Sequence, residues 1–355
     1  MANKPIRVGV VGAGANTRLH HIPKLKAIDG VEVVSVANRS RESGERVARE
    51  FGIPKVYDDW LSLVAADDTD AICIGTWPYL HCPVTLAALE HDKHVLCEAR
   101  MAMNAAEAHA MLDATRRRPR IVTQLVPAPH TLTVDRAIQQ LVADGYLGDL
   151  LAVELRAAQT AFVDPDGPLH WRHDVDLSGL NVMAMGIWYE AMMRWVGPAS
   201  RVMAMTQVCV PRRRDGQGRP RAVSVPDHVD VLATLAGGAT AHLRFSAVTG
   251  LGPASEVWLF GREGTIRLDP STLRLYGGRR GDAALAELPV PEATRVGWRV
   301  EAEFVNAIRG QETVTRTSFE DGVRYMEFTE AVARSAQLGR AIPLPLPAAR
   351  RGGAG

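Results

Sequence analysis

The chain has 355 residues, of which 46% are hydrophobic and 23% charged, and this length is usual for two globular domains. Its formal net charge of +1 gives no overall field that would favour nucleic acid or acidic lipid. The four cysteines have no CxxC pair and no zinc spacing, so we predict free thiols, no bound metal and a cytoplasmic location. The N-terminal stretch lacks an apolar signal region, and no run reaches the length of a membrane span.

Segments with a strand pattern alternate with segments with a helix pattern through the first 125 residues. The sequence predicts strands at 6–11, 31–37, 71–74, 94–97 and 121–123, and helices at 18–28, 42–51, 59–66, 81–90 and 104–115. Strands that are apolar on both faces belong to a parallel sheet covered on both sides. We therefore predict an α/β fold whose first domain, residues 1–125, is a doubly wound dinucleotide-binding (Rossmann) domain.

The pattern changes after residue 125. The sequence predicts a long apolar helix at 181–196, late helices at 301–309 and 319–338, and strands at 150–158, 201–210, 228–236, 239–248, 255–260 and 264–268. Tight turns between neighbouring strands indicate an open, largely antiparallel sheet. We predict a second, α+β domain at 126–345 that serves substrate binding and oligomerisation, followed by a disordered tail at 346–355.

The first strand runs into a glycine-rich turn at 12–14 and then into a helical pattern. Gly12 and Gly14 allow a tight turn and a close approach of the backbone to a pyrophosphate. The third position of this fingerprint, usually Gly or Ala, is Thr17. A strand before the turn, and a second strand that ends about 20 residues later, supply the context that the fingerprint requires. The turn therefore predicts a dinucleotide site rather than a purely structural turn.

The residues after the second strand indicate which dinucleotide binds. An NAD site usually places a carboxylate there for the ribose hydroxyls. This chain has the neutral Asn38, followed by Arg39 and Ser40, which can hold a 2′-phosphate, and Arg39 can also stack on adenine. We predict a preference for NADP(H), with NAD(H) possible. In the alternative interpretation these residues form only a solvated loop and a helix N-cap.

Three motifs, Val8–Gly14, Gly75–His81 and Lys93–Glu98, are similar to those of the Gfo/Idh/MocA family, and shorter matches extend the resemblance over nearly the whole chain. The resemblance implies a Rossmann domain followed by an α+β domain whose open sheet often forms a dimer interface. It also implies hydride exchange between NAD(P) and a carbinol carbon of a sugar, cyclitol or related small molecule. The cofactor contacts expected from the turn, the second strand and the resemblance are Gly12, Gly14, Asn16, Thr17, Asn38, Arg39, Ser40, Thr76, Trp77, His81, Glu98 and Arg100.

The positions that carry catalysis in that family differ here. The family's Glu-Lys-Pro motif corresponds to Glu98-Ala99-Arg100, and its helical Asp and His align with Ala184 and Trp188. General acid–base assistance contributes about 10²–10⁴-fold to a rate, so the usual alcohol oxidation by the usual residues is not expected. Retained cofactor motifs with altered catalytic positions favour a remodelled, apolar pocket.

Other residues are candidates for the pocket and for proton transfer. Each has an alternative interpretation as a packed or solvated side chain. The expected substrate pocket comprises Trp188, Trp171 and Arg172. The candidate catalytic proton donors are Tyr189, His170 and His228.

The leading hypothesis is an NADP-preferring oxidoreductase that reduces a carbonyl, an imine or a conjugated double bond of a small molecule, rather than oxidising a polyol. An electrophilic acceptor of this kind needs less proton assistance. Two alternatives are a catalytically silent dinucleotide-binding sensor or partner protein, and a lyase or isomerase whose bound NAD(P) is not consumed. We expect a homo-oligomer, a dimer or tetramer, formed through the C-terminal sheet, and no nucleic-acid or membrane partner.

Overall fold

The computed structural model describes residues 4–347, and the chain divides into two compact units. Unit 1 comprises the chain up to residue 127 together with 299–323, and unit 2 comprises 128–298 and the chain from 324 onward. The two-domain prediction had not included the return of 299–323 to the first unit. The tail expected at 346–355 lies, from residue 348 on, outside the described residues.

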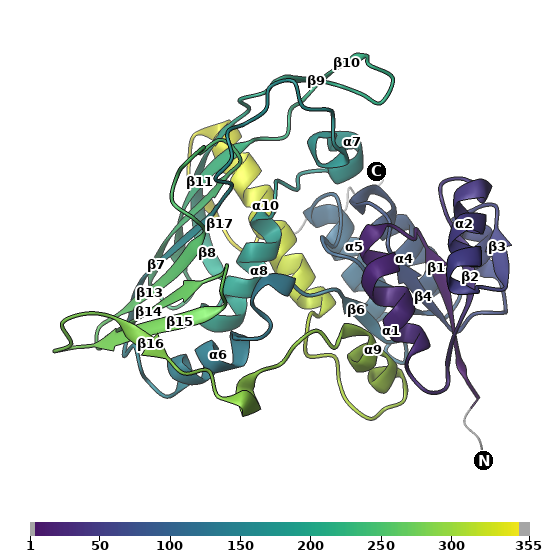
Figure 1. Ribbon diagram of the computed structural model, residues 1–355, viewed down its shortest axis with the longest axis horizontal. Helices are drawn as coiled ribbons and strands as arrows, with labels where there is room; N and C mark the ends of the chain where they lie inside the picture. The colour runs from purple at the N-terminus through teal and green to yellow at the C-terminus, as the bar shows by residue number, and fades with distance from the viewer. Residues whose placement is uncertain (1–3, 348–355) are drawn as a thin grey trace, which may run out of the picture. The chain divides into compact units, whose positions relative to one another are not determined.

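Unit 1 is built on a six-stranded parallel sheet in the order β3-β2-β1-β4-β5-β6. Figure 1 shows its helices packed around this sheet. The parallel doubly wound fold predicted from the alternating pattern is confirmed. Its strands are β1 (Ile6–Val11), β2 (Val31–Ala37), β3 (Lys55–Tyr57), β4 (Ala71–Ile74), β5 (His94–Cys97) and β6 (Thr123–Leu125). Its helices are α1 (Ile22–Lys26), α2 (Arg41–Phe51), α3 (Trp60–Ala65), α4 (His81–Glu90), α5 (Ala105–Arg116) and α9 (Val300–Ile308), and α10 (Phe319–Leu338) continues from unit 1 into unit 2.

The register of the central strands determines where the site of unit 1 lies. Val11 at the end of β1 pairs with Ala37 at the end of β2 and with Ile74 at the end of β4. All four residues of β4 are buried, as expected for a strand covered on both faces. The turns that follow these three strands therefore meet at one edge of the sheet, where ligands bind in folds of this kind.

The segment 299–323 completes unit 1 by satisfying buried polar groups of β6. Glu303 of α9 accepts hydrogen bonds from Gln124 Nε2 at 2.8 Å and from the Thr315 N–H at 3.0 Å. The Leu125 N–H donates to the Thr317 carbonyl at 3.0 Å. A buried amide without a partner would cost about 1–3 kcal/mol, so these bonds explain why a late segment returns to the first unit.

Unit 2 contains a nine-stranded sheet in the order β16-β15-β14-β13-β7-β12-β11-β8-β17. Its neighbouring strands are antiparallel except for β7 and β12, which run parallel, so the predicted open and largely antiparallel sheet is confirmed. The strands are β7 (Leu150–Ala158), β8 (Ala199–Gln207), β11 (His228–Leu235), β12 (Thr240–Ser246), β13 (Glu256–Gly261), β14 (Gly264–Asp269), β15 (Arg274–Arg279), β16 (Ala286–Leu288) and β17 (Ile342–Pro343), with a separate hairpin of β9 (Arg212–Arg214) and β10 (Pro220–Ala222).

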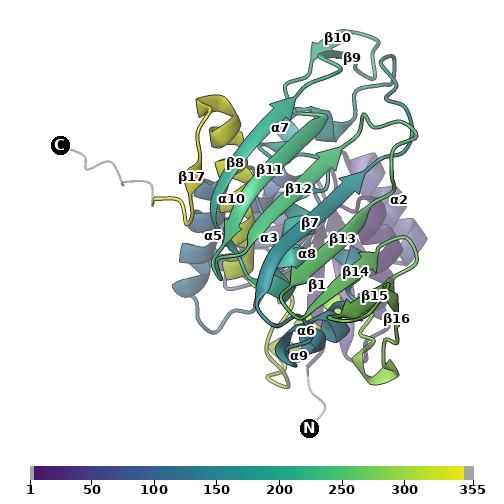
Figure 2. The same ribbon diagram turned by 90° about the vertical axis from the view of Figure 1, so that its left-hand side faces the viewer.

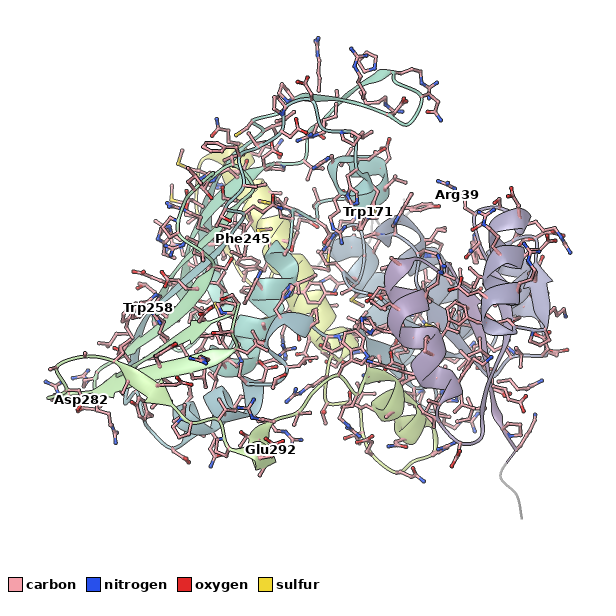
Figure 3. The ribbon with its side chains drawn as sticks, viewed as in Figure 1. Arg39, Trp171, Phe245, Trp258, Asp282 and Glu292 are labelled. Carbon is pink, nitrogen blue, oxygen red and sulfur yellow. The ribbon has the colours of Figure 1, made fainter. Side chains whose placement is uncertain are left out.

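The two faces of this sheet differ. Figure 1 shows α6 (Asp135–Ala143), α8 (Met185–Val196) and α10 on one side, and Figure 2 shows the strands of the opposite face with no helix in front of them. Phe245 is only 1% exposed and points into the covered side, whereas Trp258 lies on the open side (Figure 3). The short helix α7 (Val175–Ser178) precedes α8. Among the described residues, no helix is long and apolar enough to cross a membrane.

Candidate functional site

The glycine turn after β1 is in close contact with the end of β4. Gly12 has φ +81°, and a Cβ atom there would lie 2.5 Å from Thr76 Cγ2 and 2.8 Å from the Thr76 nitrogen. A Cβ atom at Gly75 would overlap Thr17 Oγ1 and the Gly12 carbonyl oxygen. These contacts require glycine at both positions. They also explain how Thr17 fits at the third fingerprint position, because the glycine at 75 gives it room.

The polar groups around this turn fit a bound dinucleotide. Gly14 is exposed at the beginning of the helical segment 15–26, whose first N–H groups suit an anion. The hydroxyls of Thr17 and Thr76 are buried and make no hydrogen bond with any residue that the structure describes. A pyrophosphate or ribose beside the turn would supply the acceptors that these hydroxyls lack.

The Asn38 side chain is hydrogen-bonded to the backbone of the glycine turn. Its Oδ1 accepts a hydrogen bond from the Ala13 N–H at 2.7 Å, and its Nδ2 donates to Ser43 Oγ at 3.0 Å. Both polar ends of the side chain are therefore used within unit 1. Asn38 shapes the corner between β2 and α2, and it places no negative charge there.

Arg39 and Arg41, which follow Asn38, differ in their partners. Arg41 pairs with Asp58 at 2.6 Å and with Glu45 at 3.0 Å. Arg39 is exposed and has no ion pair or hydrogen bond with any described residue, and Figure 3 shows its side chain extending away from the ribbon. Ser40 is the N-cap of α2, whose eleven residues add a favourable dipole for an anion.

A buried ion network lies behind the turn. His21 Nε2 is 2.9 Å from Glu98 Oε1, and His21 Nδ1 is 2.6 Å from Glu301 Oε1. Burial alone would lower the pKa of His21, but the hydrogen bonds to Glu301 and Glu98 outweigh it and raise the pKa to about 9. Burial raises the pKa of Glu98, but the contacts with His21 outweigh it, so this pKa lies below its usual value. Asn16 Nδ2 also donates to Glu98 Oε1, which links the turn to the end of β5.

The sequence did not identify His21 or Glu301 as site residues. Glu98 and Asn16 were expected to contact the cofactor, and the structure shows them bonded to each other. Glu301 lies 280 residues from His21, in a helix that carries no motif. No local pattern could have shown that this carboxylate reaches the first helix.

His81 is fully buried and joins two segments of the expected site. Its Nδ1 lies 2.8 Å from the Arg100 carbonyl oxygen, and its Nε2 lies 3.0 Å from the Thr76 carbonyl oxygen. Burial lowers the pKa of His81, although both carbonyls act against this effect. The buried ring offers no exposed nitrogen to a cofactor, so its visible role is to support Thr76. Trp77 is half-buried, and the Arg100 side chain is buried after a cis peptide bond with Ala99.

Helix α8 places Tyr189 in the core of unit 2. Its ring stacks on Phe328 with centroids 3.7 Å apart, and its hydroxyl accepts a hydrogen bond from the Ala199 N–H at 2.8 Å. Burial raises the pKa of Tyr189, although the Ala199 bond acts against it. These contacts give Tyr189 a packing role. Its proposed proton transfer would have to occur from a side chain that is 1% exposed.

His228 lies on the open face of the sheet in unit 2. Its Nδ1 is 2.9 Å from Ser246 Oγ, and its Nε2 is 3.0 Å from Asp230 Oδ2. Side chains alternate along β11, and His228 shares a face with the exposed Leu232. Trp188 belongs to α8 on the covered face, so the structure does not bring these two predicted site residues together.

His170, a predicted proton donor, is exposed and lies beside Trp171 and Arg172, two of the three expected pocket residues. Its Nδ1 accepts a hydrogen bond from the Arg172 N–H at 3.3 Å, which leaves Nε2 as the protonated nitrogen of the neutral ring. The Arg172 guanidinium lies 4.2 Å from the centroid of the Trp171 ring. His170 and its neighbours therefore form one aromatic and cationic cluster in unit 2.

Trp188 is buried beneath a histidine that the sequence analysis missed. The ring of His130 stacks on the indole with centroids 5.0 Å apart and an interplanar angle of 18°. Trp188 is 6% exposed, whereas His130 is exposed, so the imidazole is the accessible part of this pair. Nothing in the Pro129–Thr131 segment indicated chemistry, because the stacking depends on the fold of unit 2.

The fold and the turn of unit 1 define an NAD-type dinucleotide-binding protein with an added α+β unit. Residues 6–125 match the model described as "Oxidoreductase family, NAD-binding Rossmann fold", and residues 136–267 match the "GFO/IDH/MocA C-terminal domain". The chain belongs to the Gfo/Idh/MocA family of oxidoreductases, as the sequence motifs predicted.

Characterised relatives and solved structures are similar to the chain. A levoglucosan dehydrogenase of Pseudarthrobacter phenanthrenivorans is 26% identical over 66% of this chain and 65% of its own length. A dTDP-3,4-didehydro-2,6-dideoxy-alpha-D-glucose 3-reductase of Streptomyces antibioticus is 29% identical over 95% of this chain and 99% of its own. The structure of levoglucosan dehydrogenase in complex with NADH and L-sorbose has a TM-score of 0.83 at 23% identity, covering 96% of this chain and 99% of that one. At this identity the structural likeness shows the fold alone.

Proposed function

We propose that the chain is an NAD(P)-dependent oxidoreductase that prefers NADP(H) and reduces a carbonyl, an imine or a conjugated double bond of a small, sugar-like molecule. The family and the fitted glycine turn support the redox class. The names of the relatives, a levoglucosan dehydrogenase and a sugar-nucleotide 3-reductase, support the substrate class. The bound cofactor supplies the hydride.

The observation that carries the cofactor preference is Arg39, which lies just before α2 and has no ion pair with any residue that the structure describes. A 2′-phosphate there gains a charge-assisted hydrogen bond from Arg39 and a further one from the Ser40 hydroxyl. Asn38 contributes no negative charge that would repel the phosphate. NAD(H) lacks the phosphate and gains neither contact.

The preference for reduction rests on the residues that cannot transfer a proton. Ala99, Ala184 and Trp188 occupy positions where a polar side chain would assist the removal of a hydroxyl proton. The residues of unit 1 bind and orient the cofactor: the turn from Gly12 to Thr17 holds the pyrophosphate, and the Glu98 network holds the turn. A substrate that is already electrophilic requires the least proton assistance from the remaining side chains.

The test compares binding of NADPH and NADH by wild type, Arg39→Ala and the control Arg46→Ala. Arg46 is also exposed on α2, but it is paired with Glu42. We expect wild type to bind NADPH more tightly, and Arg39→Ala to weaken NADPH binding about 10–100-fold while NADH binding and the control change little. Equal affinity of wild type for both, or an equal loss for both in Arg39→Ala, contradicts the preference.

Turnover decides between the proposal and its alternatives. We expect a panel of carbonyl, imine and enone acceptors to accelerate NADPH oxidation. Tight binding without turnover of any acceptor would instead identify a silent dinucleotide-binding protein. Product formation without net change in NADPH would identify a lyase or isomerase.

We also propose that the open sheet face of unit 2 joins copies of the chain. Met203, Met205 and Leu232 on this face are 48%, 78% and 60% exposed, and Leu232 pairs with Met203 across neighbouring strands. Apolar side chains gathered on one face are typical of a protein–protein interface. A second copy would remove them from water.

A further inference from the structure

The buried imidazole of His21 lies one helical turn beyond the groups that would receive a pyrophosphate. The segment from Thr17 to His21 forms a widened, π-helical turn, in which the Ile22 N–H bonds to the Thr17 carbonyl. Turns of this kind occur frequently at functional sites. Thr17 also carries one of the two buried hydroxyls that make no hydrogen bond with any residue the structure describes. The histidine and the dinucleotide turn therefore share one short helix of unit 1.

The geometry around His21 requires its ring to be charged. Its Nε2 lies 2.9 Å from Glu98 Oε1, and its Nδ1 lies 2.6 Å from Glu301 Oε1. An ionised carboxylate only accepts hydrogen bonds, so each contact needs an N–H from the ring. A neutral imidazole has one N–H and would leave one of the two carboxylates without its donor.

Glu98 connects this histidine to the first residues of the dinucleotide helix. Its Oε1 also accepts a hydrogen bond from Asn16 Nδ2, and its Oε2 accepts one from the Ala99 N–H at 3.1 Å. Asn16 directly precedes Thr17 in the chain. A continuous series of contacts thus runs from Glu301 of α9 through His21 and Glu98 to the dinucleotide turn, and all of its members belong to unit 1.

Stability alone does not account for this series. The side chains of His21, Glu98 and Glu301 are 0%, 13% and 2% exposed, and removing charged groups from water is costly. Apolar residues of similar volume often stabilise a core as well as a buried ion pair does. One positive and two negative charges leave an excess negative charge behind a site for an anion. Loss of the His21 proton would double that excess.

We propose that the His21 imidazolium and Glu301 are positioning residues for the dinucleotide, and that cofactor binding weakens when His21 loses its proton. The inference rests on the cofactor binding of the proposed function. A neutral His21 releases one carboxylate, which loosens the hold on Asn16, and it increases the negative charge near the pyrophosphate. Because binding linkage is reciprocal, a bound dinucleotide holds the His21 proton more tightly by the same factor.

The groups around His21 keep their charge while His21 titrates. The bonds to its two carboxylates raise the pKa of His21 to about 9 despite its burial. Burial raises the pKa of Cys73 in β4 well above its usual value, and it lowers the pKa of His81, so both are neutral near pH 9. Arg100 and Arg39 remain protonated there. We therefore assign a change in cofactor affinity near pH 9 to His21.

The first experiment measures the Kd of NADPH by calorimetry at pH 7.5, 8.5 and 9.5, for wild type, Glu301→Gln and the control Glu303→Gln. We expect the wild-type Kd to rise at least about twofold, mostly above pH 8.5, if the coupling is at least about fivefold. The control should show the same rise. In Glu301→Gln the rise should occur at lower pH, with little change from 8.5 to 9.5. A flat wild-type Kd, or a wild-type profile in Glu301→Gln, overturns the inference.

The second experiment needs only the wild-type protein. Binding heats of NADPH at pH 9.0, in two buffers with different ionisation enthalpies, give the number of protons taken up. We expect an uptake of about 0.3 proton per bound NADPH, whereas a merely structural role of His21 predicts none. If NADPH binds more tightly than NADH at pH 7.5 but no proton is taken up at pH 9.0, the inference fails and the cofactor proposal stands. If neither dinucleotide binds, both fail.

Discussion

The buried His21 network predicts a specific loss of stability at alkaline pH. The pKa of His21 is about 9 in the folded protein, compared with the ordinary value of 6.5 expected in the unfolded chain, so folding favours the protonated form of His21. Its contribution is complete below pH 6.5 and disappears as pH rises through 9. We choose Glu301→Gln, which keeps an oxygen 2.6 Å from His21 Nδ1 in place but removes its charge. The pKa of His21 should then fall toward its usual value.

The magnitude follows from proton linkage. Raising the pKa of His21 from 6.5 to about 9 corresponds to at most about 3.4 kcal/mol. Between pH 7.5 and 8.5 His21 holds nearly one proton more in the folded protein than in the unfolded chain, so this residue should contribute a loss of about 1 kcal/mol over this unit. Other histidines, such as His81 and His94, have a lowered pKa and are already neutral there. Unfolded thiols also begin to ionise within this window, whereas burial raises the pKa of Cys73 and Cys97 in the folded protein, so these thiols add a loss of stability that is common to wild type and both variants.

The assay is urea unfolding at pH 7.5, 8.0 and 8.5, for wild type, Glu301→Gln and Glu303→Gln. Glu303 is a matched control, because it is a buried carboxylate of the same helix whose partners, Gln124 and Thr315, do not titrate. We expect the loss of stability across the window to be smaller in Glu301→Gln than in wild type by more than about 0.5 kcal/mol, because the contribution of His21 is reduced. The control should be less stable throughout but retain the wild-type slope. Equal slopes for wild type and Glu301→Gln would refute the network.

Three further changes test particular contacts. If Tyr189 serves packing, Tyr189→Phe should cost about 1 kcal/mol in urea unfolding through the lost bond to Ala199 and leave kcat intact, whereas a tenfold lower kcat at equal stability would show proton donation. Arg213 donates to the Asp164 carbonyl, so Arg213→Lys should accelerate amide hydrogen exchange in the 164–174 loop, and unchanged exchange contradicts this support. Met205→Glu should convert the expected oligomer to a monomer in sedimentation, and an unchanged mass argues against the open sheet face.

Local sequence patterns predicted most of unit 1. A parallel strand carries an unbroken apolar run, and a dinucleotide turn needs glycine at fixed spacings, so β1, β4 and the turn at Gly12 could be located from the chain alone. The sequence also showed that the neutral Asn38 stands at the end of the second strand, where an NAD site usually has a carboxylate. The structure adds that this side chain is hydrogen-bonded to Ala13 and Ser43, and that Arg39 has no ion pair or hydrogen bond with any residue in 4–347.

The sequence by itself determined the fold class, the family and the position of the dinucleotide turn, because each depends on residues that are near one another in the chain. Only the tertiary structure decided which side chains meet. It joined His21 to Glu301 across 280 residues, packed Tyr189 against Phe328, and stacked His130 on Trp188. Such pairings depend on how helices and strands pack and on the need to pair buried polar groups, and no period or spacing in the sequence encodes either.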